Sequence, residues 1–184
     1  MTTTVNGSFP QKPTNVHALS DAERKLLFGT FTFKPNPLPG NPEAIAVDPG
    51  WTRANIVSVD IPQLAALKKR ATFPVPCHKA IAMQLVGMFD AWAAAGLSDR
   101  VLSYDGCYVP RFIRGSKIKL SNHSWGTAID LNARWNPLGT YPSKIGETGC
   151  VRELVEIALA HGFYWGGWFS SRRDPQHFEA FRIL

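Results

Sequence analysis

The chain has few of the features that mark several common classes of protein. It contains only three cysteines among 184 residues, Cys77, Cys107 and Cys150. Their wide spacing matches neither a Cys-x-x-Cys metal motif nor a dense disulfide framework, so we expect buried, reduced thiols. No apolar run is long enough to span a membrane. The first residues contain neither a basic leader nor an apolar core, and we therefore expect no secretory signal.

The charges are not concentrated in any one segment. Lysine and arginine total 20 against 14 acidic residues, which gives a formal net charge of +6. Because the basic residues are scattered and form no basic tract, the sequence does not favour nucleic acid as a partner. A net positive charge does favour long-range attraction to an anionic polymer.

The length is that of one domain with a core of ordinary size. Residues 1–50 are rich in Pro, Asn, Thr and Gly, and the prolines at 34–42 disfavour helix there. In this extension Ser20 and Glu23 form a capping-box pattern, which predicts a short helix over 22–28. The apolar residues expected on its packing face are Leu26, Leu27 and Phe28. We expect the extension to pack on a catalytic domain at 51–184.

That domain mixes the patterns of strand and helix. Alternation predicts a strand at 55–61, and Pro62 begins a predicted short helix over 62–70. Helical spacing of apolar residues predicts the clearest helix over 78–95, with Met83, Met88 and Trp92 in the core. Further strands are predicted at 101–104, 127–132 and 177–183, and a helix at 149–161. These segments predict an α+β fold in which helices pack against a small, mainly antiparallel sheet.

The most informative segment reads Ser-Asn-His-Ser-Trp-Gly-Thr-Ala-Ile-Asp and places His123 and Asp130 at the ends of a turn and strand. Gly126 can supply the bend, and the period of two puts Asp130 on the face without large apolar groups. Near the chain end, Asp174-Pro-Gln-His177 adds a second carboxylate and a second imidazole. Two His and one Asp are ligands typical of catalytic zinc, and Asp174 is left to accept a proton from water.

Each half of this pattern also has a plainer interpretation. A single His-to-Asp spacing occurs by chance in many chains. Asp174 before Pro175 is also typical of a turn in which the Asp side chain caps its own backbone. The prediction of a metal site therefore depends on the two halves occurring together.

Together the two halves resemble a known family. The full pattern is Ser-x-His-x-x-Gly-x-Ala-x-Asp, followed by Trp-Gly-Gly-x-Trp and Asp-x-x-His-Phe-Glu. It is similar to that of the zinc D-alanyl-D-alanine carboxypeptidase family, which includes the VanX and VanY resistance enzymes and the L-alanyl-D-glutamate endopeptidases of phage endolysins. The resemblance covers roughly 51–184 and includes Tyr-Val-Pro-Arg-Phe-Ile-Arg-Gly-Ser ahead of the first motif. It implies the D-Ala-D-Ala carboxypeptidase-like, or hedgehog-like, fold.

The resemblance implies a role for each residue of the motifs. His123, Asp130 and His177 match the family's three ligands to Zn²⁺. Asp174 matches the general base, which is Glu in some members and Asp in others. The family also uses an arginine upstream of the first ligand to bind and polarise the substrate carbonyl.

Two arginines are candidates for that last role, Arg111 and Arg114, and Arg111 is preferred because it follows the aromatic-containing turn Tyr-Val-Pro. Glu179 lies two residues after His177 and is expected on the same face of the strand. It could therefore act as the base in place of Asp174 or as a hydrogen-bond partner of a zinc ligand, and the resemblance favours the second role. Two glycines between two indoles would let Trp165 form a flat wall of a substrate groove. Ser121, at the start of the first motif, is a further candidate for substrate binding.

The activity implied by the resemblance is zinc-dependent hydrolysis of the stem peptide of bacterial peptidoglycan. The bond cut is either L-Ala-D-Glu within the stem or D-Ala-D-Ala at its end; a short chain without an export signal favours the endopeptidase. We expect a monomer that meets the cell wall after release by a phage holin or another route independent of a secretory signal. The alternative is a noncatalytic wall-binding or phage structural module, which the presence of Asp174 disfavours.

Overall fold

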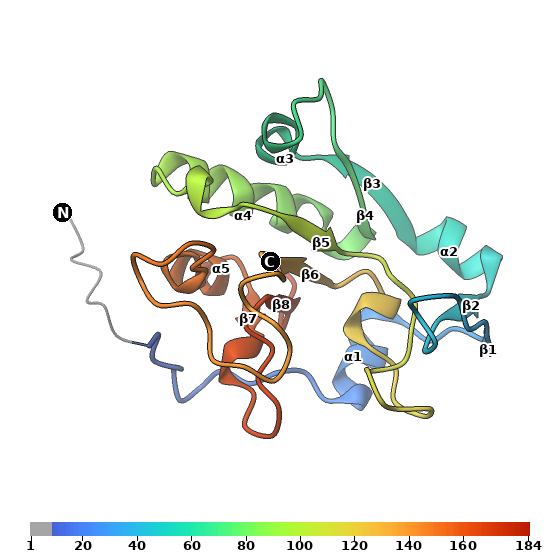
Figure 1. Ribbon diagram of the computed structural model, residues 1–184. Helices are drawn as coiled ribbons and strands as arrows, with labels where there is room; N and C mark the ends of the chain where they lie inside the picture. The colour runs from blue at the N-terminus through green and yellow to red at the C-terminus, as the bar shows by residue number, and fades with distance from the viewer. Residues whose placement is uncertain (1–8) are drawn as a thin grey trace.

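Three antiparallel sheets and five α-helices form the described part of the protein, residues 9–184 of a computed structural model (Figure 1). The helices are α1 Asp21–Phe28, α2 Pro49–Asn55, α3 Pro62–Leu67, α4 Ala82–Ala94 and α5 Val155–Ala160. Two small sheets pair β1 Phe33–Pro35 with β2 Ile45–Val47, and β3 Ile56–Asp60 with β4 Pro74–His78. The central sheet contains β5 Tyr104–Gly106, β6 Ala128–Leu131, β8 His177–Ala180 and β7 Phe163–Trp165, in that order. The predicted α+β class and mainly antiparallel pairing are confirmed.

The two faces of the central sheet differ in chemistry. Ile129 of β6 lies opposite Phe178 of β8, and both are completely buried in the apolar core. Trp92 of α4 packs edge-on against Phe178 and donates a hydrogen bond from its indole to Leu154 O at 3.0 Å. Side chains alternate along a strand, so Asp130 and His177 lie on the opposite face. The helices α4 and α5 therefore cover one face and leave the other for polar groups.

Helix α4 begins later than the pattern at 78–95 predicted. His78 ends strand β4, and its Nδ1 accepts a hydrogen bond from Ala80 N at 3.1 Å, which starts a short 3₁₀ turn before α4. Met88 and Trp92 are core residues, as expected. The assignment of Met83 to the core is wrong, because Met83 lies on the outer side of α4 and is 77% exposed.

The capping box at the start of α1 forms as predicted. Ser20 Oγ accepts from Glu23 N at 3.2 Å, and the Glu23 carboxylate accepts from Ser20 N at 2.8 Å. The packing face differs from the prediction, since Leu26 is 85% exposed and Leu27 is also exposed. The buried face instead carries Phe28 and, one turn earlier, Arg24.

Several other elements differ from their predicted bounds. The strand expected at 101–104 begins only at Tyr104, because the amides of Leu102 and Ser103 bond to the side-chain oxygen of Asn132 at 2.7 and 3.0 Å. The helix expected at 149–161 is a 3₁₀ turn, Arg152–Leu154, followed by α5. The strand expected at 177–183 ends at Ala180. The sequence patterns did not predict β1, β2, β4 or β7.

The N-terminal extension packs on the rest of the protein. Trp125 donates from its indole to Gly29 O at 2.9 Å, and Arg114 forms an ion pair with Glu43 at 2.6 Å. Figure 1 shows α1 beside the central sheet, on the side away from α4. The three cysteines are buried and free, as expected. Among residues 9–184 there is no helix with the length and apolar character needed to cross a membrane.

Candidate metal centre

The central sheet and one turn bring together His123, Asp130 and His177. The register of β6 and β8 pairs Asp130 directly with His177. His123 lies in the 3₁₀ turn Asn122–Ser124, and Gly126 then redirects the chain into β6 with a φ of 68°. A Cβ at Gly126 would lie only 3.0 Å from the backbone N of His78, so a larger residue would push β4 away from this turn.

The three side chains form a compact triangle of donor atoms. Asp130 Oδ1 lies 3.1 Å from His123 Nε2 and 2.9 Å from His177 Nδ1, and the two nitrogens are 3.2 Å apart. All three residues are buried. Ligands of tetrahedral zinc at about 2.0–2.1 Å from the ion are separated by roughly 3.3 Å. The size of the triangle and its two nitrogens and one oxygen therefore fit a zinc ion.

The charges within the triangle favour a cation. Burial raises the pKa of Asp130, but the two imidazoles outweigh it and hold that pKa well below its usual range. Burial likewise lowers the pKa of His177, whereas its hydrogen bonds to Asp130 and Glu179 raise it to about 10. The surrounding carboxylates thus stabilise positive charge at this point, whether on a proton or on a metal ion.

A second set of hydrogen bonds orients the imidazoles. His123 donates from Nδ1 to the backbone oxygen of Cys107 at 2.8 Å, and His177 donates from Nε2 to Glu179 Oε2 at 2.8 Å. Asn122 Nδ2 donates to the same carboxylate oxygen. These bonds leave Nε2 of His123 and Nδ1 of His177 turned toward the triangle, as in other metal sites with histidine ligands. Sequence reasoning missed Asn122, whose only signal is its place beside His123, and Cys107 O, which carries no side-chain signature.

Asp174 lies in a turn that leads into His177. Its carbonyl accepts from His177 N at 3.0 Å, and Gln176 donates to its carboxylate at 3.0 Å. Its own amide donates to Gly166 O at 3.0 Å, and a Cβ at Gly166 would lie 2.5 Å from Asp174 O, so only glycine permits this approach. Burial raises the pKa of the Asp174 carboxyl, and the charge of His177 only partly offsets this. The turn of the plainer interpretation is therefore present, but among residues 9–184 the Asp174 carboxylate accepts from the Gln176 side chain and not from its own backbone.

One cavity of about 780 Å³ contains the triangle and every other predicted site residue except Trp165. Asp174 and Glu179 line it near the metal triangle, and Ser121, Arg111 and Arg114 line it elsewhere. The expectation that Trp165 forms a groove wall is wrong. Its side chain is completely buried in the core, and its indole donates to Pro175 O at 2.7 Å, which helps to fix the backbone next to Asp174.

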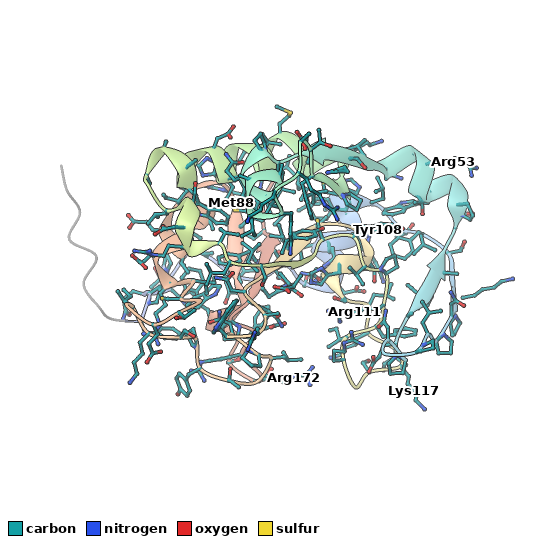
Figure 2. The ribbon with its side chains drawn as sticks, turned by 45° about the horizontal axis from the view of Figure 1, so that its top comes forward. Arg53, Met88, Tyr108, Arg111, Lys117 and Arg172 are labelled. Atoms are coloured by element: carbon teal, nitrogen blue, oxygen red, sulfur yellow. The ribbon has the colours of Figure 1, made fainter. Side chains whose placement is uncertain are left out.

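The two candidate arginines differ in their partners. Arg114 is held by Glu43 at 2.6 Å and by Asn41 at 2.9 Å. Arg111 has one longer bond, from Nη1 to Phe112 O at 3.3 Å, and burial lowers its pKa while the charges of Asp130 and Asp174 raise it. Figure 2 shows Arg111 and Arg172 on neighbouring loops. Among residues 9–184 the Arg111 guanidinium has only Phe112 O as a partner, so most of its hydrogen-bond donors remain free in the cavity.

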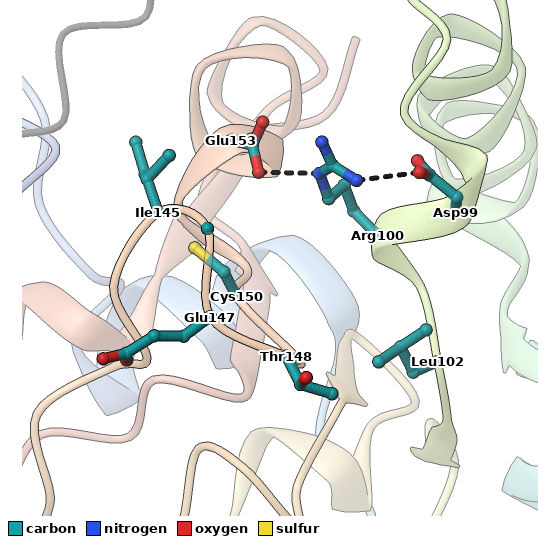
Figure 3. A pocket seen from close by; sticks show the side chains of 10 residues that line it. Asp99, Arg100, Leu102, Ile145, Glu147, Thr148, Cys150 and Glu153 are labelled. Atoms are coloured by element: carbon teal, nitrogen blue, oxygen red, sulfur yellow. Dashed lines mark hydrogen bonds and ion pairs between the residues drawn. The ribbon is translucent and has the colours of Figure 1, made fainter.

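A second cavity, of about 430 Å³, lies apart from the metal triangle (Figure 3). Arg100 crosses its wall and pairs with both Asp99 and Glu153 at 2.7 Å. Cys150 also lines it and is almost fully buried. None of the predicted site residues lines this cavity. The cavity around the metal triangle is therefore the candidate active site.

Comparison with known proteins agrees with this choice. The family model described as D-alanyl-D-alanine carboxypeptidase matches residues 114–180. The matched segment includes the metal triangle and Asp174, ends with the last residue of β8, and begins after Arg111. No curated protein and no solved structure gives a match. The resemblance to this zinc peptidase family is confirmed over that segment.

Proposed function

We propose that the protein is a zinc-dependent peptidase that cuts the stem peptide of bacterial peptidoglycan at the L-Ala-D-Glu bond. The observation that carries this proposal is the buried triangle of His123, Asp130 and His177, with Asp174 in the same cavity and the same family segment. These three residues would hold the zinc ion. When bound, zinc supplies a Lewis acid that polarises a carbonyl and lowers the pKa of water.

Asp174 is the proton carrier of the proposed reaction. Its carboxylate accepts the proton of the attacking water and then returns it to the amine of the departing peptide. Burial raises its pKa toward the working pH, as suits a group that must both take and release a proton. Glu179 is less suited to this role, because one of its carboxylate oxygens already accepts hydrogen bonds from two buried donors, His177 Nε2 and Asn122 Nδ2.

Arg111 is the proposed stabiliser of the carbonyl oxygen as negative charge develops on it. Its guanidinium is planar, permanently charged and rich in donors, and only one backbone carbonyl occupies it. Arg114 is less suited because Glu43 and Asn41 already hold it. In this proposal Arg111 acts on the substrate, whereas Arg114 fixes the N-terminal extension.

The shape of the site supports cleavage within the stem. The cavity adjoins a second hollow of about 590 Å³, since Arg24, Ile113 and Lys119 line both. Together the two spaces offer room for peptide on both sides of the cut bond. The description of the matched family favours the alternative, a D-alanyl-D-alanine carboxypeptidase. A noncatalytic wall-binding module is the third candidate, and Asp174 in the cavity counts against it.

The products formed from cell wall distinguish these functions. Purified zinc-loaded protein would be incubated with peptidoglycan, with and without a chelator, and the soluble products identified by mass spectrometry. New amino termini at D-Glu that vanish with chelator are expected. Released D-Ala would identify the carboxypeptidase, and wall binding without any product would identify the noncatalytic module. Asp174→Ala protein is the matched control for hydrolysis by a contaminant.

A further inference from the structure

The N-terminal extension forms part of the wall of the candidate active site. Helix α1 contributes Arg24 to the cavity that holds the metal triangle and to the neighbouring hollow, which Phe31 and Trp125 also line. On the other side both spaces are bounded by the segment that carries Ile113 and Lys119. Arg24 and Lys119 thus lie where the two spaces meet.

The positive charge of the buried Arg24 is only partly balanced by the groups around it. Only 8% of the residue is exposed, and its guanidinium lies 5.3 Å above the ring of Trp125. It donates from Nη2 to Leu19 O at 3.0 Å, but the nearest carboxylate oxygen in an ion pair, on Asp21, is 3.7 Å from Nη1. Its buried Nε has no partner among residues 9–184. A buried cation is costly unless an anion pairs with it, so this site is suited to an anionic ligand.

Lys119 and Ser121 add polar groups to the same wall. Lys119 is exposed, and its ammonium makes no ion pair with any residue in the described part of the chain. Ser121 lies two residues along and also lines the cavity. Of the other cations of this cavity, Glu43 holds Arg114, and Arg111 already has the proposed role at the carbonyl oxygen. Arg172 is exposed and donates to Arg114 O at 2.9 Å. Arg24 and Lys119 are the two cations that line both the cavity and the neighbouring hollow.

We propose that Arg24 and Lys119 form a carboxylate-binding subsite that makes the N-terminal extension part of substrate recognition. The proposal rests on the proposed function and deepens it. Arg24 lines the same cavity as the metal triangle and as Glu179, which is hydrogen-bonded to His177. A substrate carboxylate beside the cut bond would lie in that cavity. In the proposed substrate that group is the free carboxylate of D-Glu.

The test compares two synthetic stem peptides that contain L-Ala-D-Glu, one with the free D-Glu carboxylate and one in which it is amidated. Hydrolysis of each would be measured with zinc-loaded wild type, Lys119→Gln and Arg24→Gln. Lys117→Gln is the matched control, because Lys117 is exposed in the same loop and lines neither space (Figure 2). Arg24→Lys keeps the charge and tests whether charge alone restores binding.

Loss of one charge-assisted contact is expected to raise KM for the free-carboxylate peptide about tenfold, with kcat and the amidated peptide unaffected. Lys117→Gln should match wild type. If Arg24→Gln hydrolyses both peptides less well by the same factor, Arg24 has a structural role. If Lys119→Gln has the same KM as wild type for the free-carboxylate peptide, the proposed subsite is wrong. If wild type cuts neither peptide, the proposed cleavage fails. Calorimetry would then measure the binding of the two peptides and test the subsite independently of hydrolysis. The subsite is supported only if wild type binds the free-carboxylate peptide more tightly than the amidated one and Lys119→Gln loses that preference.

Discussion

Glu179→Gln should weaken zinc binding while leaving the protein folded and the chemical step intact. In the structure one oxygen of Glu179 accepts hydrogen bonds from both His177 and Asn122, and the residue is 3% exposed. Glutamine keeps the shape and one acceptor oxygen, so both donors retain a partner. What the substitution removes is the negative charge that makes His177 a stronger ligand.

The size of the effect follows from that position. Mutation of the carboxylate behind a metal-bound histidine typically reduces metal affinity by about 10–100-fold. Glu179→Ala should be harsher, because it leaves two buried donors unsatisfied at a cost of roughly 1–3 kcal/mol each. The alanine variant should therefore lose stability as well as zinc, whereas the glutamine variant should lose mainly zinc affinity.

A competition titration against a chelating dye measures the zinc affinity, and thermal unfolding of the metal-free proteins measures stability. Turnover would be measured at saturating zinc, where Glu179→Gln should approach wild type. An unchanged zinc affinity combined with abolished turnover would refute this reasoning. Glu179 would then be the base, and the roles of Glu179 and Asp174 would have to be exchanged.

Three further predictions concern individual side chains. Asp174→Ala should keep a full equivalent of zinc, measured by metal analysis, but lose about a hundredfold or more of hydrolysis; an active variant would remove Asp174 from the mechanism. Arg111→Lys should lower turnover with zinc content and melting temperature near wild type, and Arg114→Lys should be milder because Glu43 rather than substrate holds Arg114; the reverse ranking would move the role to Arg114. Burial raises the pKa of Cys77 from 9.0 to about 12, so the stability due to its neutral thiol is present below about pH 9 and lost as pH rises toward 12. Its labelling by a thiol reagent at pH 8 should therefore require unfolding, and rapid labelling of the native protein would contradict the burial of β4.

The sequence predicted the parts of the site that depend on local pattern. The alternation around Asp130 gave the correct strand, and Ser20 with Glu23 gave the correct start of α1. Metal-ligand chemistry limited the choice of residue types, so two motifs sufficed to select the three members of the triangle. The pairing of Asp130 with His177 across two strands is a long-range contact that neither motif contains by itself.

The errors arose where tertiary contacts override local pattern. Met83 has an apolar side chain at helical spacing, but the face of α4 that packs on the sheet does not include it. Trp165 precedes two glycines that suggested a groove, yet its ring lies on the core face of β7. Arg24 lies on the buried face of α1, where it lines the cavity. No feature of the helix sequence indicates that a charged residue would be buried there.

The most direct test of the account is the zinc content of purified wild type, His123→Ala and His177→Ala, measured together with peptidoglycan hydrolysis. Folding of each variant would be checked by circular dichroism. Wild type should bind one equivalent of zinc, lose hydrolysis with a chelator and regain it when zinc is restored. Each folded alanine variant should lose most of its zinc and its hydrolysis together. Folded variants that keep a full equivalent of zinc, or a wild type that hydrolyses the wall equally well without metal, would contradict the assignment of this triangle as the catalytic centre.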